Sequence, residues 1–142
     1  MKTSFRPGIT LDAINAMNRN TMIEHLGIEV IAVGQGTIEA RMPVDHRTHQ
    51  PFGILHGGAS VALAESMGSI AAYCTLTDEN KHCVGLEINA NHIKSIKSGY
   101  VYGVATPIHL GSRTQVWEIR ITNEAKDLIC ISRITMAIID KR

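Results

Sequence analysis

The sequence lacks most of the features that mark specialised classes of protein. Its 142 residues carry a formal net charge of +1, and the basic residues are spread along the chain. Such a balance gives no general attraction to nucleic acid or to an anionic membrane, so we expect neither as a partner. The opening MKTSFRPGITLDAIN has no apolar run of a secretory signal. No repeat, low-complexity tract or linker is present, which predicts a single domain over residues 1–142 with its own core.

Cysteine is scarce, and two catalytic signatures are missing. Cys74, Cys83 and Cys130 are odd in number and widely spaced, with no CxxC pair. This pattern fits a reducing cytoplasm in which each thiol is a small buried hydrophobe. No GxSxG elbow of a serine hydrolase occurs, and no HExxH motif gives metal-ligand spacing to the nearby His46 and His49. We therefore expect no bound metal.

One stretch stands out for what it contains. After Gly57 and Gly58, residues 59–76 hold a single charge, Glu65, among residues that favour helix. A helix that is apolar on nearly every side is a buried helix, and this one is too short and too rich in small residues for a membrane span. The pattern predicts a central helix with a carboxylate in the protein interior. An unpaired buried charge is costly, so Glu65 is the first candidate for a catalytic residue.

The rest of the chain predicts strands around that helix. A short helix capped by Thr10, a second over residues 21–26 and strands at 28–33 and 37–44 precede it. Strands at 82–93, 100–110, 113–122 and 128–139 follow it, and turn residues between the last three predict antiparallel neighbours. The order predicts the α+β class, with one six-stranded antiparallel sheet wrapped around one long central helix.

HGG at the start of this helix, with an acid eight residues after the first glycine, resembles the hot-dog-fold acyl-CoA thioesterases. The likeness is carried by MPVDHRTHQPFGILHGGASVALAESMGSIA, VGLEINANHIKS and PIHLGSRTQVWEI. It points to the branch that contains 1,4-dihydroxy-2-naphthoyl-CoA hydrolase of menaquinone biosynthesis and the proofreading thioesterase of enterobactin synthesis. The resemblance implies the hot-dog fold, an aromatic acyl-CoA substrate and no cofactor beyond the CoA of the substrate. We also expect an obligate dimer within a homotetramer.

The residues themselves suggest how a thioester could be hydrolysed. Gly57 and Gly58 begin a helix, whose first N–H groups lack internal partners and suit a developing oxyanion. The pair could equally be only a tight entry into the helix. Glu65 lies about 12 Å further along at about 1.5 Å per residue, so one carbonyl cannot touch both within a chain. We therefore expect Gly57 of one protomer to face Glu65 of the other.

Further roles are implied by the resemblance. Gln50 and His56 would orient the thioester beside the Gly57 N–H, and Glu65 would be the nucleophile or the general base that activates water. His56 could otherwise be an ordinary loop anchor. Ser69 lies one turn beyond Glu65 on the same face and could hold its carboxylate or the water. Ser69 could equally bond the Glu65 carbonyl within the helix.

The resemblance also assigns segments that bind substrate and CoA. They are Gly85, His92, Ile93, Lys94, Ser95, His109, Leu110, Gly111, Ser112, Arg113 and Thr114. Backbone N–H groups at the turn and the basic side chains could meet phosphates, although a plain hairpin with solvated lysines explains the same residues. The intervening KSIKSGYVYG has lysine where the family tends to have arginine, and lysine lacks the bidentate fork. For an acyl pocket between protomers the candidates are Phe52, Ile54, Ile70 and Tyr73.

Three functions stay open at this point. The first is a thioesterase that acts on an aromatic acyl-CoA. The second is a proofreading thioesterase that clears misacylated acyl carrier protein, which would then be a partner. The third is a non-catalytic acyl-CoA-binding module, against which the acid at Glu65 argues. A hot-dog dehydratase is less consistent with the sequence, because no His-centred motif of that family is present.

Overall fold

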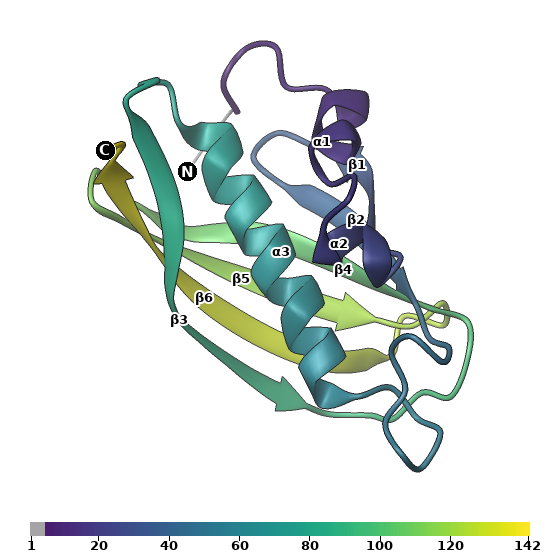
Figure 1. The fold of residues 1–142 in the computed structure, drawn as a ribbon. Helices are drawn as coiled ribbons and strands as arrows, with labels where there is room; N and C mark the ends of the chain where they lie inside the picture. Colours follow the sequence, from purple (N-terminus) through teal and green to yellow (C-terminus); the bar gives the residue numbers. More distant parts are fainter. Residues whose placement is uncertain (1–4) are drawn as a thin grey trace.

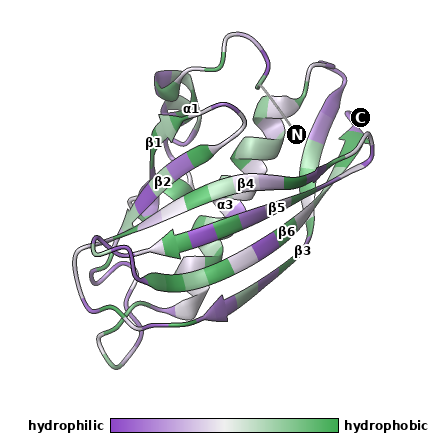
Figure 2. Cartoon of the chain, turned by 180° about the vertical axis from the view of Figure 1, so that it is seen from behind, coloured by the Kyte–Doolittle hydropathy of each residue, from purple (hydrophilic) through white to green (hydrophobic). Residues whose placement is uncertain are grey.

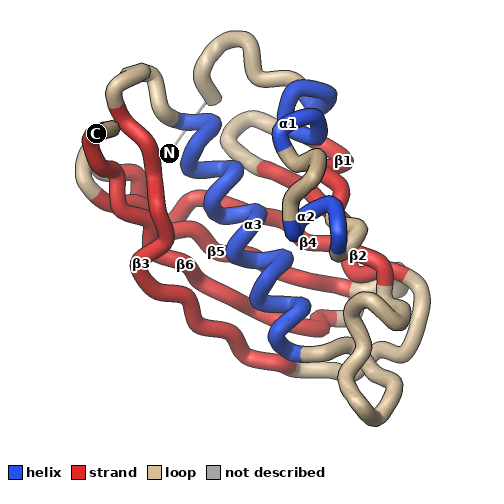
Figure 3. Tube along the Cα trace, viewed as in Figure 1, coloured by secondary structure: helices blue, strands red, loops and turns tan. Residues whose placement is uncertain are grey.

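The long helix α3, Gly57–Thr75, lies across the inner face of a six-stranded antiparallel sheet (Figure 1). The computed structural model describes residues 5–142. Two short helices, α1 and α2, lie on the same side of the sheet, so one helical layer faces one sheet (Figure 3). The predicted α+β hot-dog architecture is confirmed. The elements are α1 (Leu11–Met17), α2 (Met22–His25), β1 (Glu29–Val33), β2 (Ile38–Pro43), α3, β3 (Lys81–His92), β4 (Tyr100–Leu110), β5 (Thr114–Thr122) and β6 (Leu128–Asp140).

Local sequence signals place these elements accurately. Every predicted strand is present, and no predicted strand boundary differs from the observed one by more than one residue. The side chain of Thr10 caps α1 by accepting a hydrogen bond from the Ala13 N–H at 3.2 Å. In β5 the alternation puts Trp117, Ile119 and Ile121 on the helix-facing side, where each is fully buried. Period-two alternation therefore identifies the inner face of the sheet.

The order of the strands is β1-β2-β4-β5-β6-β3. Strands β4, β5 and β6 are antiparallel neighbours, as the turn residues predict. Strand β3 instead pairs with β6 at the far edge of the sheet, although β4 follows it in the chain. Its open edge exposes Val84 to 41% and Leu86 to 63%. An unpaired edge with exposed apolar side chains is a surface on which another strand can add.

The prediction that α3 is buried on nearly every side is wrong for the single protomer. Ten of its residues are buried, and they face the sheet. Gly58, Ala62, Glu65, Ser69 and Tyr73 recur at helical spacing on the opposite side and are half-buried or exposed. We call these five residues the open stripe. Most side chains of α3 are small, so the helix is apolar on average. Its composition therefore does not show which face packs against the rest of the chain.

The outer face of the sheet is also uncovered by helix in the described residues. Figure 2 shows it from behind, with hydrophobic and hydrophilic residues alternating along the strands. All three cysteines are free thiols, and burial raises the pKa of each, that of Cys74 to about 11. Within residues 5–142, no helix is both long enough and apolar enough to cross a membrane.

Candidate active site

The N-terminus of α3 carries a single unpaired hydrogen-bond donor. His56 is the N-cap, and its Nδ1 accepts a hydrogen bond from the Gly58 N–H at 2.7 Å. The His56 carbonyl accepts the N–H groups of Ala59 at 2.9 Å and Ser60 at 3.3 Å. Of the first four N–H groups of α3, the one on Gly57 alone has no acceptor within residues 5–142. Of the two glycines predicted to supply a free N–H group, only Gly57 therefore does so in the described chain.

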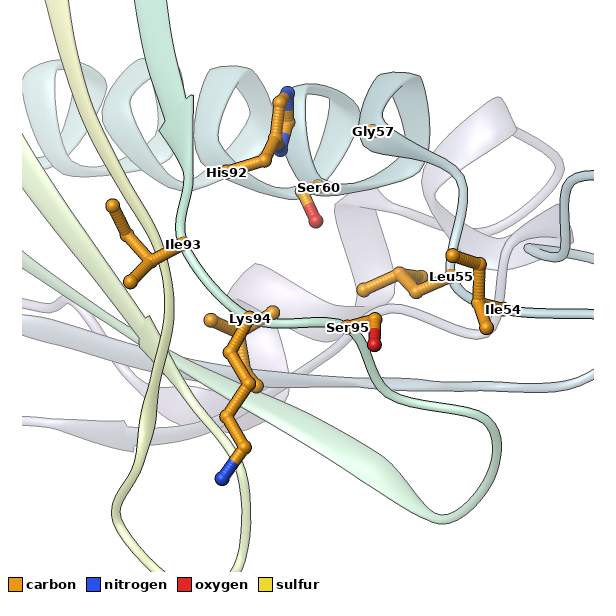
Figure 4. A pocket seen from close by; sticks show the side chains of 9 residues that line it. Ile54, Leu55, Gly57, Ser60, His92, Ile93, Lys94 and Ser95 are labelled. Carbon is orange, nitrogen blue, oxygen red and sulfur yellow. The ribbon is translucent and has the colours of Figure 1, made fainter.

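The imidazole of His92 packs directly on Gly57. A Cβ atom added to Gly57 would lie 2.9 Å from His92 Nε2 and 3.0 Å from its Cε1. In Figure 4 the His92 side chain extends from the end of β3 toward the first turn of α3. Glycine at position 57 therefore lets an imidazole lie next to the free N–H group. The sequence predicts an oxyanion role for Gly57 and a substrate- or CoA-binding role for His92, and the structure brings the two residues into contact.

A cleft of about 320 Å³ opens beside this helix start. Its wall is mainly apolar and is formed by Ile54, Leu55, Ile93 and Ile129, together with Gly57, Ser60, His92, Lys94 and Ser95. The predicted segment 92–95 thus meets Gly57 at one site (Figure 4). The Lys94 side chain points away from the cleft in this view, and its Nζ pairs with Asp127 Oδ2 at 2.6 Å. This ion pair lowers the pKa of Asp127. The ammonium group of Lys94 is therefore already paired with a carboxylate of its own chain.

Ser60 is a polar residue of the site that sequence reasoning missed. Its side chain is only 1% exposed, and its hydroxyl points into the cleft in Figure 4. No partner for that hydroxyl is found within the described chain. A usable signal was the serine in HGGAS, three residues after the first glycine, because residues three apart share a helix face.

Glu65 lies on the open stripe and not in the interior of the protomer. The side chain is half-buried and makes no hydrogen bond or ion pair with residues 5–142. Its carboxylate lies against β3, where a Cβ on Gly85 would be 2.5 Å from Glu65 Oε1. Ser69 makes neither of the predicted bonds to Glu65, because its hydroxyl reaches Met136 Sδ at 3.9 Å. Gly85, which the resemblance implies to bind substrate, therefore lies next to the carboxylate of Glu65.

The loop before α3 is held by its own side chains. The Gln50 side-chain oxygen accepts the N–H of Phe52, and the Gln50 N–H donates to the Ile54 carbonyl at 2.9 Å. The side chain of Phe52 is 88% exposed, so it lines no pocket in the single protomer. Earlier in this loop, hydrogen bonds from the side chain and backbone of Arg47 lower the pKa of Asp45 to about 2. The predicted orienting residue Gln50 therefore also shapes the loop that leads to Gly57.

The remaining predicted substrate residues, 109–114, lie elsewhere. The Gly111 N–H donates to the Thr114 carbonyl at 2.9 Å, and the His109 ring packs on Gly111. This turn lines a second cleft of about 400 Å³ together with Thr75 and Leu76. Those residues end α3, whereas Gly57 begins it, and 19 residues at about 1.5 Å each span roughly 28 Å. In one protomer the predicted CoA-binding segments therefore form two separate groups, at opposite ends of the helix.

No cluster of three or more His, Cys, Asp or Glu side chains suited to a metal ion occurs within residues 5–142. The helix start offers a backbone donor, imidazoles and hydroxyls, and the carboxylate of Glu65 lies further along the same helix. These groups suit acyl transfer to water, which needs an oxyanion site and a base or nucleophile.

The family model of the thioesterase superfamily matches residues 52–130. This span includes α3, whose two ends contribute to the two clefts. The chain belongs to the thioesterase superfamily, and it is a thioester hydrolase. It is 56% identical over 131 residues to 1,4-dihydroxy-2-naphthoyl-CoA hydrolase of Escherichia coli (strain K12), covering 92% of this chain and 96% of that protein. Membership of this family argues against the non-catalytic alternative.

Two further relatives cover almost the whole chain. The proofreading thioesterase EntH of Cronobacter turicensis is 51% identical over 130 residues, covering 92% of this chain and 94% of that protein. The crystal structure of a thioesterase from Haemophilus influenzae is 51% identical, with a TM-score of 0.92 over 96% of this chain and 94% of that one. The similarity therefore includes the loop, the central helix and all six strands.

Proposed function

We propose that this protein is a cytoplasmic acyl-CoA thioesterase that hydrolyses an aromatic acyl-CoA to the free acid and CoA. The substrate is 1,4-dihydroxy-2-naphthoyl-CoA or a compound like hydroxybenzoyl-CoA. Support comes from the 56% identity, over nearly the full length, to the E. coli 1,4-dihydroxy-2-naphthoyl-CoA hydrolase. A place in menaquinone biosynthesis rests on the same similarity.

One observation carries the proposal. Gly57 offers the free N–H at the start of α3, and Glu65 offers an unpartnered carboxylate on the same helix, within the part of the chain that is described. Eight residues along a helix separate them by about 12 Å, too far for one carbonyl. The two groups serve one thioester only when they come from two protomers. The protein is accordingly an obligate dimer with two composite sites.

The same arrangement reunites the two groups of predicted CoA-binding residues. Two α3 helices that run antiparallel, with Gly57 of each beside Glu65 of the other, bring the C-terminal end of one near the N-terminal end of its partner. The turn at residues 109–114 then approaches the partner's segment 92–95. A second copy would also cover the open stripe and the free edge of β3. Burial of Glu65 is then a property of the dimer.

In the proposed reaction the thioester carbonyl oxygen accepts the Gly57 N–H, where the helix dipole favours developing negative charge. Gln50 and His56 orient the thioester. Glu65 either attacks the carbonyl carbon or takes a proton from water, whose oxygen then attacks. If Glu65 attacks, the carbon–sulfur bond breaks to give a mixed anhydride with Glu65, and water then hydrolyses this anhydride to the free acid and restores the carboxylate. If water attacks, its oxygen forms the new bond to the carbonyl carbon as the carbon–sulfur bond breaks. In both routes the proton that leaves the water protonates the CoA thiolate. In this proposal Ser60 and Ser69 hold water or substrate near these groups, and the Ser69 hydroxyl turns from Met136 Sδ to do so.

Substitution of Glu65 by Gln tests the chemistry. We expect kcat on aromatic acyl-CoA to fall by about two or more orders of magnitude while substrate binding remains, because an amide is neither base nor nucleophile. Glu87→Gln is the matched control, since Glu87 is an exposed carboxylate on β3. Unchanged hydrolysis by the Glu65 variant would reject the assignment. A panel of acyl-CoA substrates ranked by kcat/KM tests the preference for an aromatic acyl group.

Subunit complementation tests the composite site. When inactive Gly57 and Glu65 variants are mixed and reassembled at equal amounts, half of the dimers are heterodimers, and each has one intact site. Because half of the dimers have one intact site out of two, about 25% of wild-type activity should return. A site built within one protomer would recover no activity. A fully active monomer in the analytical ultracentrifuge would also contradict the proposal.

We further propose that two dimers assemble into a tetramer. The uncovered outer face of the sheet exposes Val104 to 36% and Ile139 to 41%, which supports a further contact there. Val104→Glu should then yield dimers that keep the composite site. Sedimentation that shows a wild-type dimer at working concentrations would exclude the tetramer.

A second candidate is a proofreading thioesterase that hydrolyses misacylated acyl carrier protein. The 51% identity to EntH of C. turicensis favours it. Turnover of one acyl group on CoA and on carrier protein, compared as kcat/KM, separates the two functions. A preference for the carrier protein by tenfold or more, about 1.4 kcal/mol, would make proofreading the better description.

A further inference from the structure

Gly85 has no conformational reason to be glycine. It lies within β3, and its φ is outside the positive range in which glycine is favoured. Glycine inside a strand weakens it and often marks a bulge or a close approach by another group. The structure shows both at this position.

The closest contact is with Glu65. The three heavy atoms nearest to a Cβ built on Gly85 all belong to this side chain, with Oε1 at 2.5 Å, Cδ at 3.5 Å and Oε2 at 3.7 Å. A distance of 2.5 Å is too short for any Cβ, so the carboxylate occupies the space that a side chain at 85 would fill. Because a carboxylate is the end of a flexible side chain, adding a methyl group would move Glu65 and leave the backbone in place.

The strand is also distorted at this point. The register of β3 against β6 shifts between Gly85 and Glu87, which leaves Leu86 as an extra residue. Such bulges occur next to active sites, where they re-aim a side chain or the local backbone. Here the bulge directly follows the glycine that touches the carboxylate. No hydrogen bond or ion pair from residues 5–142 fixes Glu65 in another way.

We propose that Gly85 is a positioning residue for Glu65: its missing side chain sets where the carboxylate lies over β3. The inference rests on the proposed function and deepens it. It differs from the role implied by the family resemblance, in which Gly85 contacts the substrate.

Gly85→Ala distinguishes the two roles. A positioning residue affects the chemical step, so kcat should fall about 100-fold, as expected when a reacting group is displaced by about 1 Å. KM should stay within about twofold, because substrate contacts are unchanged. A substrate contact predicts the opposite, a raised KM with kcat retained, and this result would overturn the inference. Gly103→Ala is the control: its Cβ would clash with the buried Met67 Sδ, so it should lower stability without a selective loss of kcat.

A double-mutant cycle tests whether the effect passes through the carboxylate. Aspartate at 65 is shorter by one methylene, so the added methyl group no longer meets it. In the Glu65→Asp background, Gly85→Ala should change kcat less than about threefold, a coupling typical of residues in contact. Independent, additive losses at the two positions would overturn the inference.

A crystal structure of Gly85→Ala separates this inference from the proposed function. We expect the Glu65 carboxylate to move and the β3 backbone to stay. An unmoved carboxylate with a shifted strand would overturn the positioning role whatever the activity. If Glu65→Gln hydrolyses normally, the proposed catalytic role of Glu65 fails, and the coordinates still decide whether Gly85 sets its position.

Discussion

Replacing Gly57 by proline should remove the proposed oxyanion donor and leave the helix start intact. Proline has no N–H and is favoured at the first position of a helix. The residue before a proline must be extended, and His56 already has φ −68° and ψ 131°. The group nearest to a Cβ at position 57 is the His92 ring, at 2.9 Å, and His92 is an exposed side chain that can move. The substitution therefore isolates one hydrogen bond.

The size of the effect follows from the other donors at the helix start. The Gly58 N–H is bonded to His56 Nδ1, and the next two N–H groups are bonded to the His56 carbonyl. No other N–H group of the first helical turn is free, within the described residues, to replace the one that is lost. Removal of a single oxyanion donor lowers kcat by about 10²–10³-fold, or roughly 3–4 kcal/mol of transition-state stabilisation. We expect a loss in this range, with the thermal midpoint nearly unchanged.

The assay is steady-state release of the CoA thiol from an aromatic acyl-CoA, followed with a thiol-reactive chromophore. Gly57→Ala is the matched control, because it adds a Cβ beside His92 and keeps the N–H group. We expect alanine to cost less than about tenfold. Equal losses in both variants would show that crowding against His92 matters and the donor does not. A proline variant with activity near wild type would refute the oxyanion role of Gly57.

Three further predictions concern stability and CoA binding. Arg6→Ala should lower the free energy of unfolding by about 1–2 kcal/mol in urea titrations. The reason is that the Arg6 guanidinium donates hydrogen bonds to two carbonyls at the end of α3, at 2.9 and 3.0 Å. Arg19→Ala is the control and should have little effect, because Arg19 is exposed and makes no such bonds. The lowered pKa of Asp45, about 2 against an ordinary 3.8, means that its carboxylate stabilises the fold above pH 3.8 and that this contribution is lost as the pH falls toward 2. The urea midpoints of wild type and Asp45→Asn should therefore differ at pH 6 and converge near pH 2, and a constant difference would contradict the assignment. Arg113→Ala should raise KM for acyl-CoA more than Lys94→Ala, since the Lys94 ammonium is already paired within the protomer, and an effect confined to kcat would exclude phosphate binding by Arg113.

Several features of the site follow from local sequence. HGG at the end of a loop predicted a helix start with free N–H groups, and the free donor is found at Gly57. The spacing to Glu65 along that helix predicted that the two groups are too far apart to act together in one chain. Both results need only the geometry of a single helix, which sequence determines well.

Other features of the site were not predictable from local sequence. Ser60 is part of the cleft because β3 returns beside the first turn of α3, a contact between residues far apart in the chain. The ion pair between Lys94 and Asp127 forms because the segment after β3 lies beside the turn before β6. The separation of segments 92–95 and 109–114 follows from the ends of β3 and β4 lying at opposite ends of α3. Sequence spacing gives no information about such long-range placements.

The sequence by itself determined the elements, their inner faces and the chemical groups available, because periodicity, capping and turn residues act over a few residues. The tertiary structure alone decided that β3 lies at the edge beside β6, that residues 5–142 leave the Glu65 side of α3 partly exposed, and that Gly85 touches the carboxylate. These facts depend on which strands pair and which helix face the sheet covers. A helix of small apolar residues can pack against a sheet through more than one face, so its composition could not show whether the chain's own sheet covers Glu65.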